Sequence, residues 1–320
     1  MVGDMSEAQM PRVAPRERNP ESEALRALAA RTPVLPFEAV AVKIAPALRL
    51  GVISASAADG QGNIYVYHRP KEDTLQDPVV VIDAKGRVLR TFGKGRDPMP
   101  HGIEIDAQGN LWTVDANTSI VRKLTPQGDV LLEVSVGDIP VPEKLFCGAI
   151  GVAFRKDGHF YVGDGYQNAR VVEYAADGRK LRQWGRHGGG PGEFNLVHDI
   201  SAAADGTVYV ADRENGRVQW FDPDGGYLGQ KHFGGQLFSV AVAPDGMVYV
   251  GIQARVTAGD RVPSNIYKFD PATGTVIGRI EIIAHQLTVG PDGSLYPGTA
   301  SAKIGDDPNA TSILVFRPRT

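Results

Sequence analysis

Short apolar strands that follow a glycine turn recur six times along the chain. The six copies are QGNIYVY from Gln61, QGNLWTV from Gln108, DGHFYVG from Asp157, DGTVYVA from Asp205, DGMVYVG from Asp245 and DGSLYPG from Asp292. Their turn glycines are 40 to 49 residues apart. A period of that length indicates a repeat architecture rather than two unrelated domains.

Each complete unit of the repeat has room for four short strands. In the second unit they are HGIEID from His101, NLWTVD after the turn, SIVRKLTP from Ser119 and VLLEVSVG from Val130. Four antiparallel strands in about 40 to 50 residues make one propeller blade. The pattern therefore predicts an all-β, six-bladed β-propeller.

The two ends of the repeat region complement each other. The last unit reaches only three strands, ending with SILVFRPRT from Ser312, whereas a spare strand-like run, FEAVAVKI from Phe37, precedes the first unit. We expect this N-terminal strand to complete blade six and close the ring, which removes exposed sheet edges. Residues 37–320 would form the propeller and catalytic domain. Residues 1–36 would form an arm, either a disordered leader or a segment with a short helix from Ser22.

Composition narrows the class of partner. The chain has 34 basic and 37 acidic residues, a net charge of −3, so no electrostatic feature favours nucleic acid or an anionic membrane. A small-molecule substrate is expected. The single cysteine, Cys147, excludes an intramolecular disulfide. With no long apolar run and no signal-like segment, the sequence predicts a cytoplasmic protein.

Three histidines occupy one register of the repeat. His101, His198 and His285 each lie eight residues before the turn glycine, in blades two, four and six. The same slot holds Ser54, Ile150 and Phe238 in the other blades. Rotation about the channel axis would place the imidazoles about 120° apart at one mouth. Three imidazoles with an open fourth position are typical of catalytic zinc.

Polar residues near the end of the second strand should reach the same mouth, because that strand runs back toward it. Six to eight residues after the turn glycines stand His68, Arg69, Asp115, Asp164, Tyr166, Asp212 and Arg213. Arginines beside a metal predict an anionic substrate. A tyrosine there would have a lowered pKa and could act as a base. The aspartates and arginines have a second interpretation, in which they pair with each other between loops.

A glycine-rich stretch, GRHGGGPGEFN from Gly185, lacks the Lys-Ser/Thr ending of a phosphate loop and precedes no expected helix. We interpret it as the connection between two blades.

With these motifs in place, the sequence resembles NHL-repeat propellers, and among them the peptidyl-α-hydroxyglycine α-amidating lyase family. The resemblance extends over most of the chain from about residue 50. Its strongest stretch runs from FYVGDGYQNARVVEY at Phe160, through FNLVHDI, to VYVADRENGRVQWFD at Val208.

The resemblance implies roles for six residues. It implies zinc, or another divalent transition metal, bound by His101, His198 and His285. It implies Tyr166 as the catalytic tyrosine, with Arg69 and Arg213 as active-site arginines that also hold the substrate. The implied reaction cleaves N-acyl-α-hydroxyglycine to a primary amide and glyoxylate.

The sequence departs from the family pattern in two places. Gln167 stands where the family usually has a disulfide cysteine, and Gln286 replaces an aspartate associated with a structural calcium, which argues against that ion. The copper monooxygenase part of bifunctional relatives is absent from this sequence. We therefore expect a bacterial, intracellular enzyme that acts on a smaller hydroxylated metabolite.

Two other functions stay open at this stage. A metal-dependent hydrolase of an ester, lactone or amide would use a carboxylate beside the metal, and Asp199 and Asp164 are the candidates. Asp164, Asp199 and His68 are also candidate substrate-binding residues. A non-enzymatic NHL interaction module would bind through a broad basic or hydrophobic face, and it would not need three histidines in one register.

Overall fold

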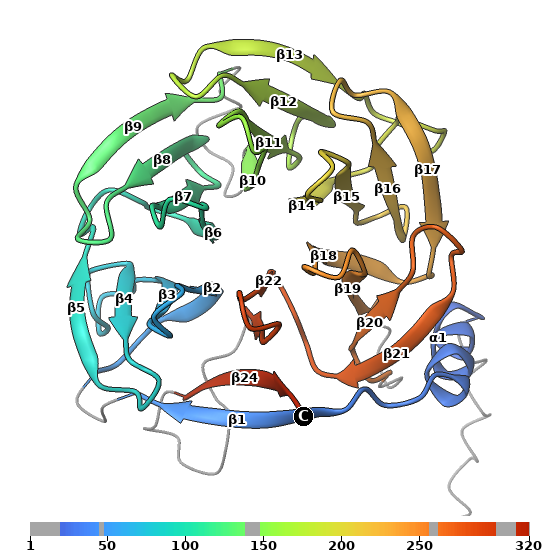
Figure 1. Ribbon diagram of the computed structural model, residues 1–320, viewed down its shortest axis with the longest axis horizontal. Helices are drawn as coiled ribbons and strands as arrows, with labels where there is room; N and C mark the ends of the chain where they lie inside the picture. Colours follow the sequence, from blue (N-terminus) through green and yellow to red (C-terminus); the bar gives the residue numbers. More distant parts are fainter. Residues whose placement is uncertain (1–19, 45–47, 138–147, 256–261, 299–311, 320) are drawn as a thin grey trace, which may run out of the picture.

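The computed structural model of the chain describes residues 20–44, 48–137, 148–255, 262–298 and 312–319. Within this part of the chain, six four-stranded antiparallel sheets are arranged around a central axis (Figure 1). The six-bladed β-propeller predicted from the repeat is thereby confirmed. The arm before residue 20 and Cys147 lie outside the described residues.

The first three blades each follow the chain from the channel outward. Blade one contains β2 (Val52–Ala58), β3 (Ile64–Arg69), β4 (Val79–Ile82) and β5 (Val88–Phe92). Blade two contains β6 (Pro100–Ile105), β7 (Leu111–Asp115), β8 (Ile120–Leu124) and β9 (Val130–Ser135). Blade three contains β10 (Ala149–Phe154), β11 (Phe160–Asp164), β12 (Arg170–Tyr174) and β13 (Lys180–Trp184).

Blades four and five repeat this order, and blade six uses both ends of the described chain. Blade four contains β14 (Val197–Ala202), β15 (Val208–Asp212), β16 (Arg217–Phe221) and β17 (Tyr227–His232). Blade five contains β18 (Gln236–Val242), β19 (Val248–Gln253), β20 (Asn265–Phe269) and β21 (Val276–Glu281). Blade six contains β22 (Leu287–Val289), β23 (Leu295–Pro297), β24 (Ser312–Pro318) and β1 (Phe37–Lys43).

The ring closes as predicted, by pairing of the N-terminal strand with the C-terminal one. Strand β1 pairs antiparallel with β24 from Phe37 opposite Pro318 to Lys43 opposite Ser312. The outermost strand of blade six therefore comes from the start of the propeller sequence, while its three inner strands come from the end.

The hairpin turns follow the chemistry that their sequences predict. All six turn glycines have positive φ, between 78° and 93°. That conformation carries little steric cost only for glycine. In the DG turns the aspartate also caps the backbone: the Asp205 carboxylate accepts a hydrogen bond from the Thr207 N–H at 2.9 Å.

The hydrophobic core consists of the interfaces between blades. The buried apolar residues of the described chain form six clusters, each shared by two neighbouring blades. The two sheet faces of each blade are covered by its neighbours, so strands near the axis are buried almost throughout.

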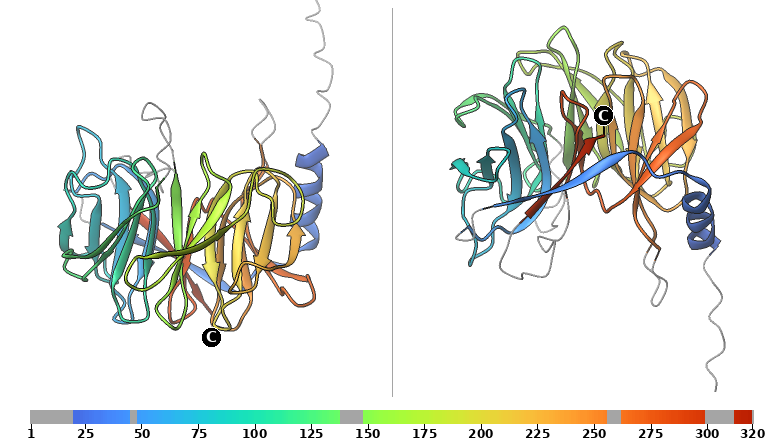
Figure 2. Two further views of the ribbon diagram at one scale, coloured as in Figure 1. Left: turned by 90° about the horizontal axis from the view of Figure 1, so that it is seen from above. Right: turned by 60° about the horizontal axis from the view of Figure 1, so that its bottom comes forward.

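A helix, α1 (Pro20–Arg31), precedes β1 and lies against the outside of the ring beside blade five (Figures 1 and 2). Its Leu25 and Leu28 belong to the cluster shared by blades four and five. Across the residues that the structure describes, no helix combines the length and the apolar character needed to span a membrane.

Candidate metal and substrate site

The three histidines protrude from the strands because each occupies an irregular position. In blades one to five the slot residue falls at a register shift between the inner two strands, as His101 does between Pro100 and Gly102. In blade six His285 precedes the start of β22. A bulged residue is unpaired, so its side chain and its carbonyl are released from the regular ladder.

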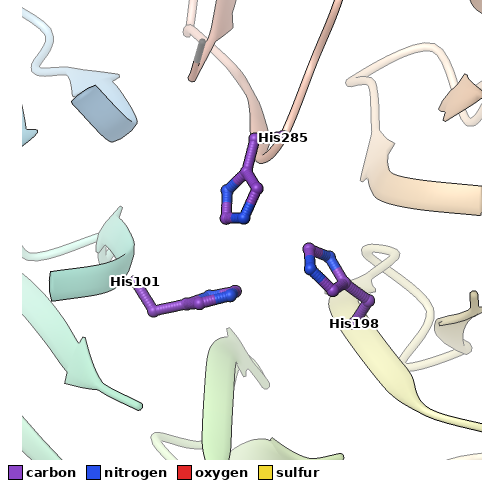
Figure 3. Close-up of side chains that lie close together, drawn as sticks. All are labelled: His101, His198 and His285. Atoms are coloured by element: carbon purple, nitrogen blue, oxygen red, sulfur yellow. The ribbon is translucent and has the colours of Figure 1, made fainter. Parts of the chain in front are cut away.

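The histidine side chains meet on the channel axis (Figure 3). Their ring centroids are 4.8, 4.9 and 5.1 Å apart, close to an equilateral triangle. One ring nitrogen from each residue lies within 4.8 Å of the other two, and all three residues are buried. The structure therefore brings together the three residues that the sequence register singled out.

Each histidine is oriented by the slot residue of the next blade. His101 Nδ1 lies 2.8 Å from the Ile150 carbonyl oxygen, His198 Nδ1 lies 2.7 Å from that of Phe238, and His285 Nδ1 lies 3.2 Å from that of Ser54. Because a carbonyl oxygen can only accept, we assign the ring proton to Nδ1 in all three. The Nε2 lone pairs are then available at the centre of the ring.

The three imidazoles are held in their neutral form. Burial lowers the pKa of His285 to about 4, and it lowers the pKa of His101 and His198 well below the usual value. Nearby cationic side chains, Arg69 and Arg213, act in the same direction on His285 and His101. Neutral imidazoles with converging lone pairs fit a divalent transition metal, and the donor set leaves a coordination position for a substrate.

The Tyr166 hydroxyl contacts two of the three converging imidazoles. It lies 3.1 Å from His101 Nε2 and 3.2 Å from His198 Nε2. The preceding glycine makes this possible: a Cβ on Gly165 would lie 1.7 Å from the carbonyl oxygen of Val197, the residue before His198. The DGY motif thus packs its backbone against the strand that carries the second histidine.

Burial and the two arginines have opposite effects on the pKa of the Tyr166 phenol. Burial raises it to about 12, although Arg213 and Arg69 both act to lower it. The prediction of a lowered pKa referred to a phenol beside both a bound metal ion and the arginines, and it stays a prediction. The effect of burial exceeds that of the two arginines.

The two arginines lie beside two different histidines, Arg213 near His198 and Arg69 near His101. Arg213 places its guanidinium 4.5 Å from the centroid of the Phe238 ring, and that ring packs 4.9 Å from the ring of His198. Arg69 donates from Nε to the carbonyl oxygen of Pro100 at 3.0 Å, beside His101. Both arginines contribute electrostatically at Tyr166.

Phe238 also contacts the site residues, although it was not predicted as a site residue; it occupies the same slot as the histidines. Its carbonyl orients His198 and its ring supports Arg213. The slot alignment was the signal that could have identified it.

Asp164 does not present a free carboxylate to substrate. Its Oδ2 accepts from Arg170 Nε at 2.7 Å and from Asn168 Nδ2 at 3.0 Å, and the residue is buried. The side chain thus closes the loop that carries Tyr166. Asp212 has the same role in blade four, where it accepts from Arg217 Nε at 2.7 Å. Both aspartates thus pair with an arginine at the start of the third strand of their own blade, Arg170 in β12 and Arg217 in β16, rather than with Arg69 or Arg213.

Asp199 is held by the backbone. Its Oδ1 accepts from the N–H of Ile200 at 2.9 Å and its Oδ2 from the N–H of Val240 in blade five at 3.0 Å. Burial raises its pKa well above the ordinary value. Gln286 donates from Nε2 to the carbonyl oxygen of His198 at 2.9 Å, so this amide connects blade six to blade four next to the ring.

His68 is corrected from a substrate-binding residue to a structural one. Its Nδ1 accepts from the Gly51 N–H at 3.1 Å and its Nε2 donates to the Asp77 carbonyl oxygen at 2.9 Å. Both ring nitrogens are thereby engaged by the backbone, and burial lowers the pKa to about 4. A neutral, fully bonded imidazole has no donor or acceptor left for a substrate.

The glycine-rich stretch connects β13 to β14, as the sequence indicated. Its carbonyls are bound by the buried Arg217, which donates to the carbonyl oxygens of Gly189, Gly190 and Glu193 at 2.8 to 2.9 Å. An arginine in the core of the connection therefore serves structure rather than substrate binding.

Comparisons with known proteins agree with this architecture. A family model described as NHL repeat matches residues 194–221, the stretch that contains His198 and Arg213. The streptogramin B lyase structure superposes with a TM-score of 0.59 over 88% of this chain and 98% of that one, at 12% identity. At this level of identity the superposition supports the fold alone.

Several curated relatives carry amidating names. The chain is 28% identical over 294 residues to peptidyl-glycine alpha-amidating monooxygenase B of Xenopus laevis, covering 80% of this chain and 33% of the relative. It is 32% identical over 200 residues to the probable peptidyl-alpha-hydroxyglycine alpha-amidating lyase of Caenorhabditis elegans, covering 55% of this chain and 57% of the relative. The chain thus spans about a third of the first relative's length and somewhat more than half of the second's.

The six-bladed architecture, the matched NHL repeat and the amidating-lyase relatives point to one group of proteins. The chain is similar to NHL-repeat proteins over residues 194–221 and to the peptidyl-α-hydroxyglycine α-amidating lyases over a longer stretch.

Proposed function

We propose that the protein is a metal-dependent lyase that cleaves the C–N bond of a carbinolamide, such as an N-acyl-α-hydroxyglycine, to an amide and glyoxylate or a related carbonyl compound. The observation that carries this proposal is the Tyr166 hydroxyl, which lies within 3.2 Å of two of the three converging imidazoles, with Arg213 and Arg69 acting on the same phenol. The names of the curated relatives support the same reaction class.

His101, His198 and His285 would hold the metal, for which zinc is the first choice and another divalent transition metal an acceptable one. The bound ion would supply positive charge that polarises the hydroxyl or carboxylate oxygen of the substrate. The Nδ1 bonds to carbonyl oxygens keep the three side chains in one orientation, so little reorganisation is needed on binding.

Arg213 and Arg69 are suited to the carboxylate of an α-hydroxyglycine. A guanidinium presents a planar fork of donors to a carboxylate, and the Phe238 ring keeps that of Arg213 in place. Holding the carboxylate fixes the hydroxyl-bearing carbon relative to Tyr166, which lowers the entropic part of the barrier.

Tyr166 is the group that can move the proton. Its phenolate form, which both arginines favour, would take the hydroxyl proton of the substrate as the C–N bond breaks and the carbonyl forms. The electron pair of the broken bond goes to the amide nitrogen, which receives a proton in turn. Atoms and electrons balance without an oxidant or a further reactant.

A hydrolase is less well supported by the site. That reaction would need a carboxylate free to activate water, whereas Asp164 is paired with Arg170 and both oxygens of Asp199 accept backbone N–H groups.

We infer a small-molecule substrate, because the small net charge gives no basis for binding nucleic acid or an anionic membrane.

The test combines metal analysis with a glyoxylate-release assay on α-hydroxyhippurate. We expect about one zinc per chain in the wild type and in Tyr166→Phe, and loss of the metal in His285→Ala. Tyr166→Phe should lower kcat by at least about 100-fold, because a general acid–base group contributes about that much. Full metal occupancy without glyoxylate release from the wild type would contradict the lyase assignment.

A further inference from the structure

Helix α1 is connected to the candidate active site by a chain of charged side chains. Its first turn carries Glu21, whose Oε2 lies 2.5 Å from Arg255 Nη1 and whose Oε1 accepts from the Arg255 backbone N–H at 3.2 Å. Arg255 follows β19, and this pairing joins residues 234 positions apart in the sequence. The helix therefore reaches the end of blade five where the second strand returns toward the histidines.

Arg255 in turn holds the residue that follows Arg213. Its Nη2 donates to the Glu214 carbonyl oxygen at 2.5 Å and lies 3.4 Å from Glu214 Oε2. The other carboxylate oxygen, Oε1, lies 3.1 Å from Arg213 Nε and accepts from Gln236 Nε2 at 2.8 Å. Glu214 is thus a carboxylate shared between Arg213 and Arg255.

The helix cannot easily shift relative to this chain of contacts. Leu25 and Leu28 are buried against blade five, and a Cβ on Gly235, just before β18, would lie 3.0 Å from Leu25 Cδ1. Strand β18 carries Phe238, the aromatic support of Arg213. At the other end of the helix, Arg279 Nε donates to the Ala29 carbonyl oxygen at 2.9 Å.

We propose that helix α1 is a positioning element of the active site, in which Glu21, through Arg255 and Glu214, keeps the Arg213 guanidinium directed at the substrate. Arg255 neutralises one side of the Glu214 carboxylate. Without it, that carboxylate would bind Arg213 more closely and compete with the carboxylate of the substrate. This inference rests on the proposed function for the nature of the ligand, but the contacts themselves do not depend on it.

The experiment measures kcat and KM for α-hydroxyhippurate, together with hippurate binding to the zinc-loaded protein. Arg255→Gln should raise KM and weaken hippurate binding about three- to fivefold, the range expected for a partly exposed ion pair. Glu21→Gln should act in the same direction by about twofold. In both variants kcat and zinc content should stay at wild-type values, because Tyr166 and the histidines are untouched.

Two controls separate positioning from general stability. Lys268→Gln removes a comparable ion pair of blade five, the 2.7 Å contact with Asp245, and should leave KM unchanged. In an Arg213→Gln background, Arg255→Gln should have no further effect, because its only route to the substrate is through Arg213. An equal effect of Arg255→Gln in both backgrounds would overturn the proposal.

An independent readout keeps the test valid if the enzyme has another substrate. The Nε–H resonance of Arg213, assigned by its loss in Arg213→Lys, should shift in Arg255→Gln and Glu21→Gln but not in Lys268→Gln. Absence of glyoxylate release by the wild type would reject the lyase assignment, whereas an unmoved Arg213 resonance would reject the role of the helix.

Discussion

The position of the candidate acid–base tyrosine depends on one glycine. Gly165 lies so close to the Val197 carbonyl that a Cβ would be 1.7 Å from its oxygen. On one side of it Asp164 anchors the loop through Arg170, and on the other the Tyr166 hydroxyl lies 3.1 Å from His101 Nε2. A methyl group at position 165 would force the loop away from the strand of His198.

We therefore predict that Gly165→Ala lowers kcat about 100-fold, because a displacement of about 1 Å at a reacting group has effects of that size. Zinc content should not change, since the histidines are held by other carbonyls. The matched control is Gly189→Ala in the glycine-rich connection, where an added Cβ would meet no atom within 4 Å. Steady-state kinetics and metal analysis of both variants test this, and wild-type kcat in Gly165→Ala would disprove it.

At the scale of elements, stability depends on how the ring is closed. Strand β1 alternates between an exposed and a core-facing side: Ala41 is exposed, whereas Val42 is 4% exposed and packs with Ile313 and Val315. The strand that precedes every other element of the propeller is thus built into the interface between blades six and one. A substitution that disrupts the packing of β1 should therefore separate β1 from β24 and open the ring.

Val42→Asp should consequently destabilise the protein by about 3 kcal/mol or more, because it places an unpaired charge in an apolar cluster. For a chain of this size that corresponds to a fall in Tm of about 5 °C. Ala41→Asp introduces the same charge on the exposed side of the same strand and should change Tm little. Thermal unfolding followed by circular dichroism distinguishes them, and equal Tm values would refute this account of ring closure.

At the scale of the whole molecule, polar residues of the channel follow alternate blades. Three residues after the slot, blades two, four and six carry Glu104, Ser201 and Thr288, whereas the other blades carry alanine. Ser201 Oγ accepts from the Val242 N–H of the next blade at 3.1 Å, and Thr288 Oγ1 donates to the Ser56 carbonyl oxygen of the next blade at 2.9 Å. The histidines of blades two, four and six are likewise oriented by a group of the following blade, in their case a carbonyl oxygen.

Glu104 lies at the opposite mouth of the channel and lines a cavity of about 620 Å³. Burial raises its pKa from the ordinary 4.5 to about 8. Between these values the folded chain binds a proton that the unfolded chain has released, so Glu104 makes the free energy of unfolding fall as pH rises from 4.5 to 8.

Replacing this side chain with a neutral isostere should remove that dependence. Relative to the wild type, Glu104→Gln should gain stability progressively between pH 5 and pH 8 and show little gain at pH 5. Urea unfolding at pH 5, 6.5 and 8 measures the difference, and Glu38→Gln, at an exposed position of β1, controls for the loss of one negative charge. A difference that is independent of pH would contradict a raised Glu104 pKa.

The sequence alone determined the architecture and the metal-ligand candidates. Turn glycines and alternating strands are local features, so their six-fold period predicted six blades, and the spare strand at Phe37 predicted the closure with β24. Because a propeller relates its blades by rotation, a shared register was sufficient to place His101, His198 and His285 at one point.

Only the tertiary structure decided what each polar side chain is free to do. Hydrogen-bond partners and burial are set by residues far apart in the chain, so no spacing rule shows that backbone groups occupy His68, that Arg170 binds Asp164, or that burial outweighs two arginines at Tyr166. The contacts that connect α1 to Arg213 could not be predicted from the sequence for the same reason, because Glu21 and Arg255 meet only when the helix packs against blade five.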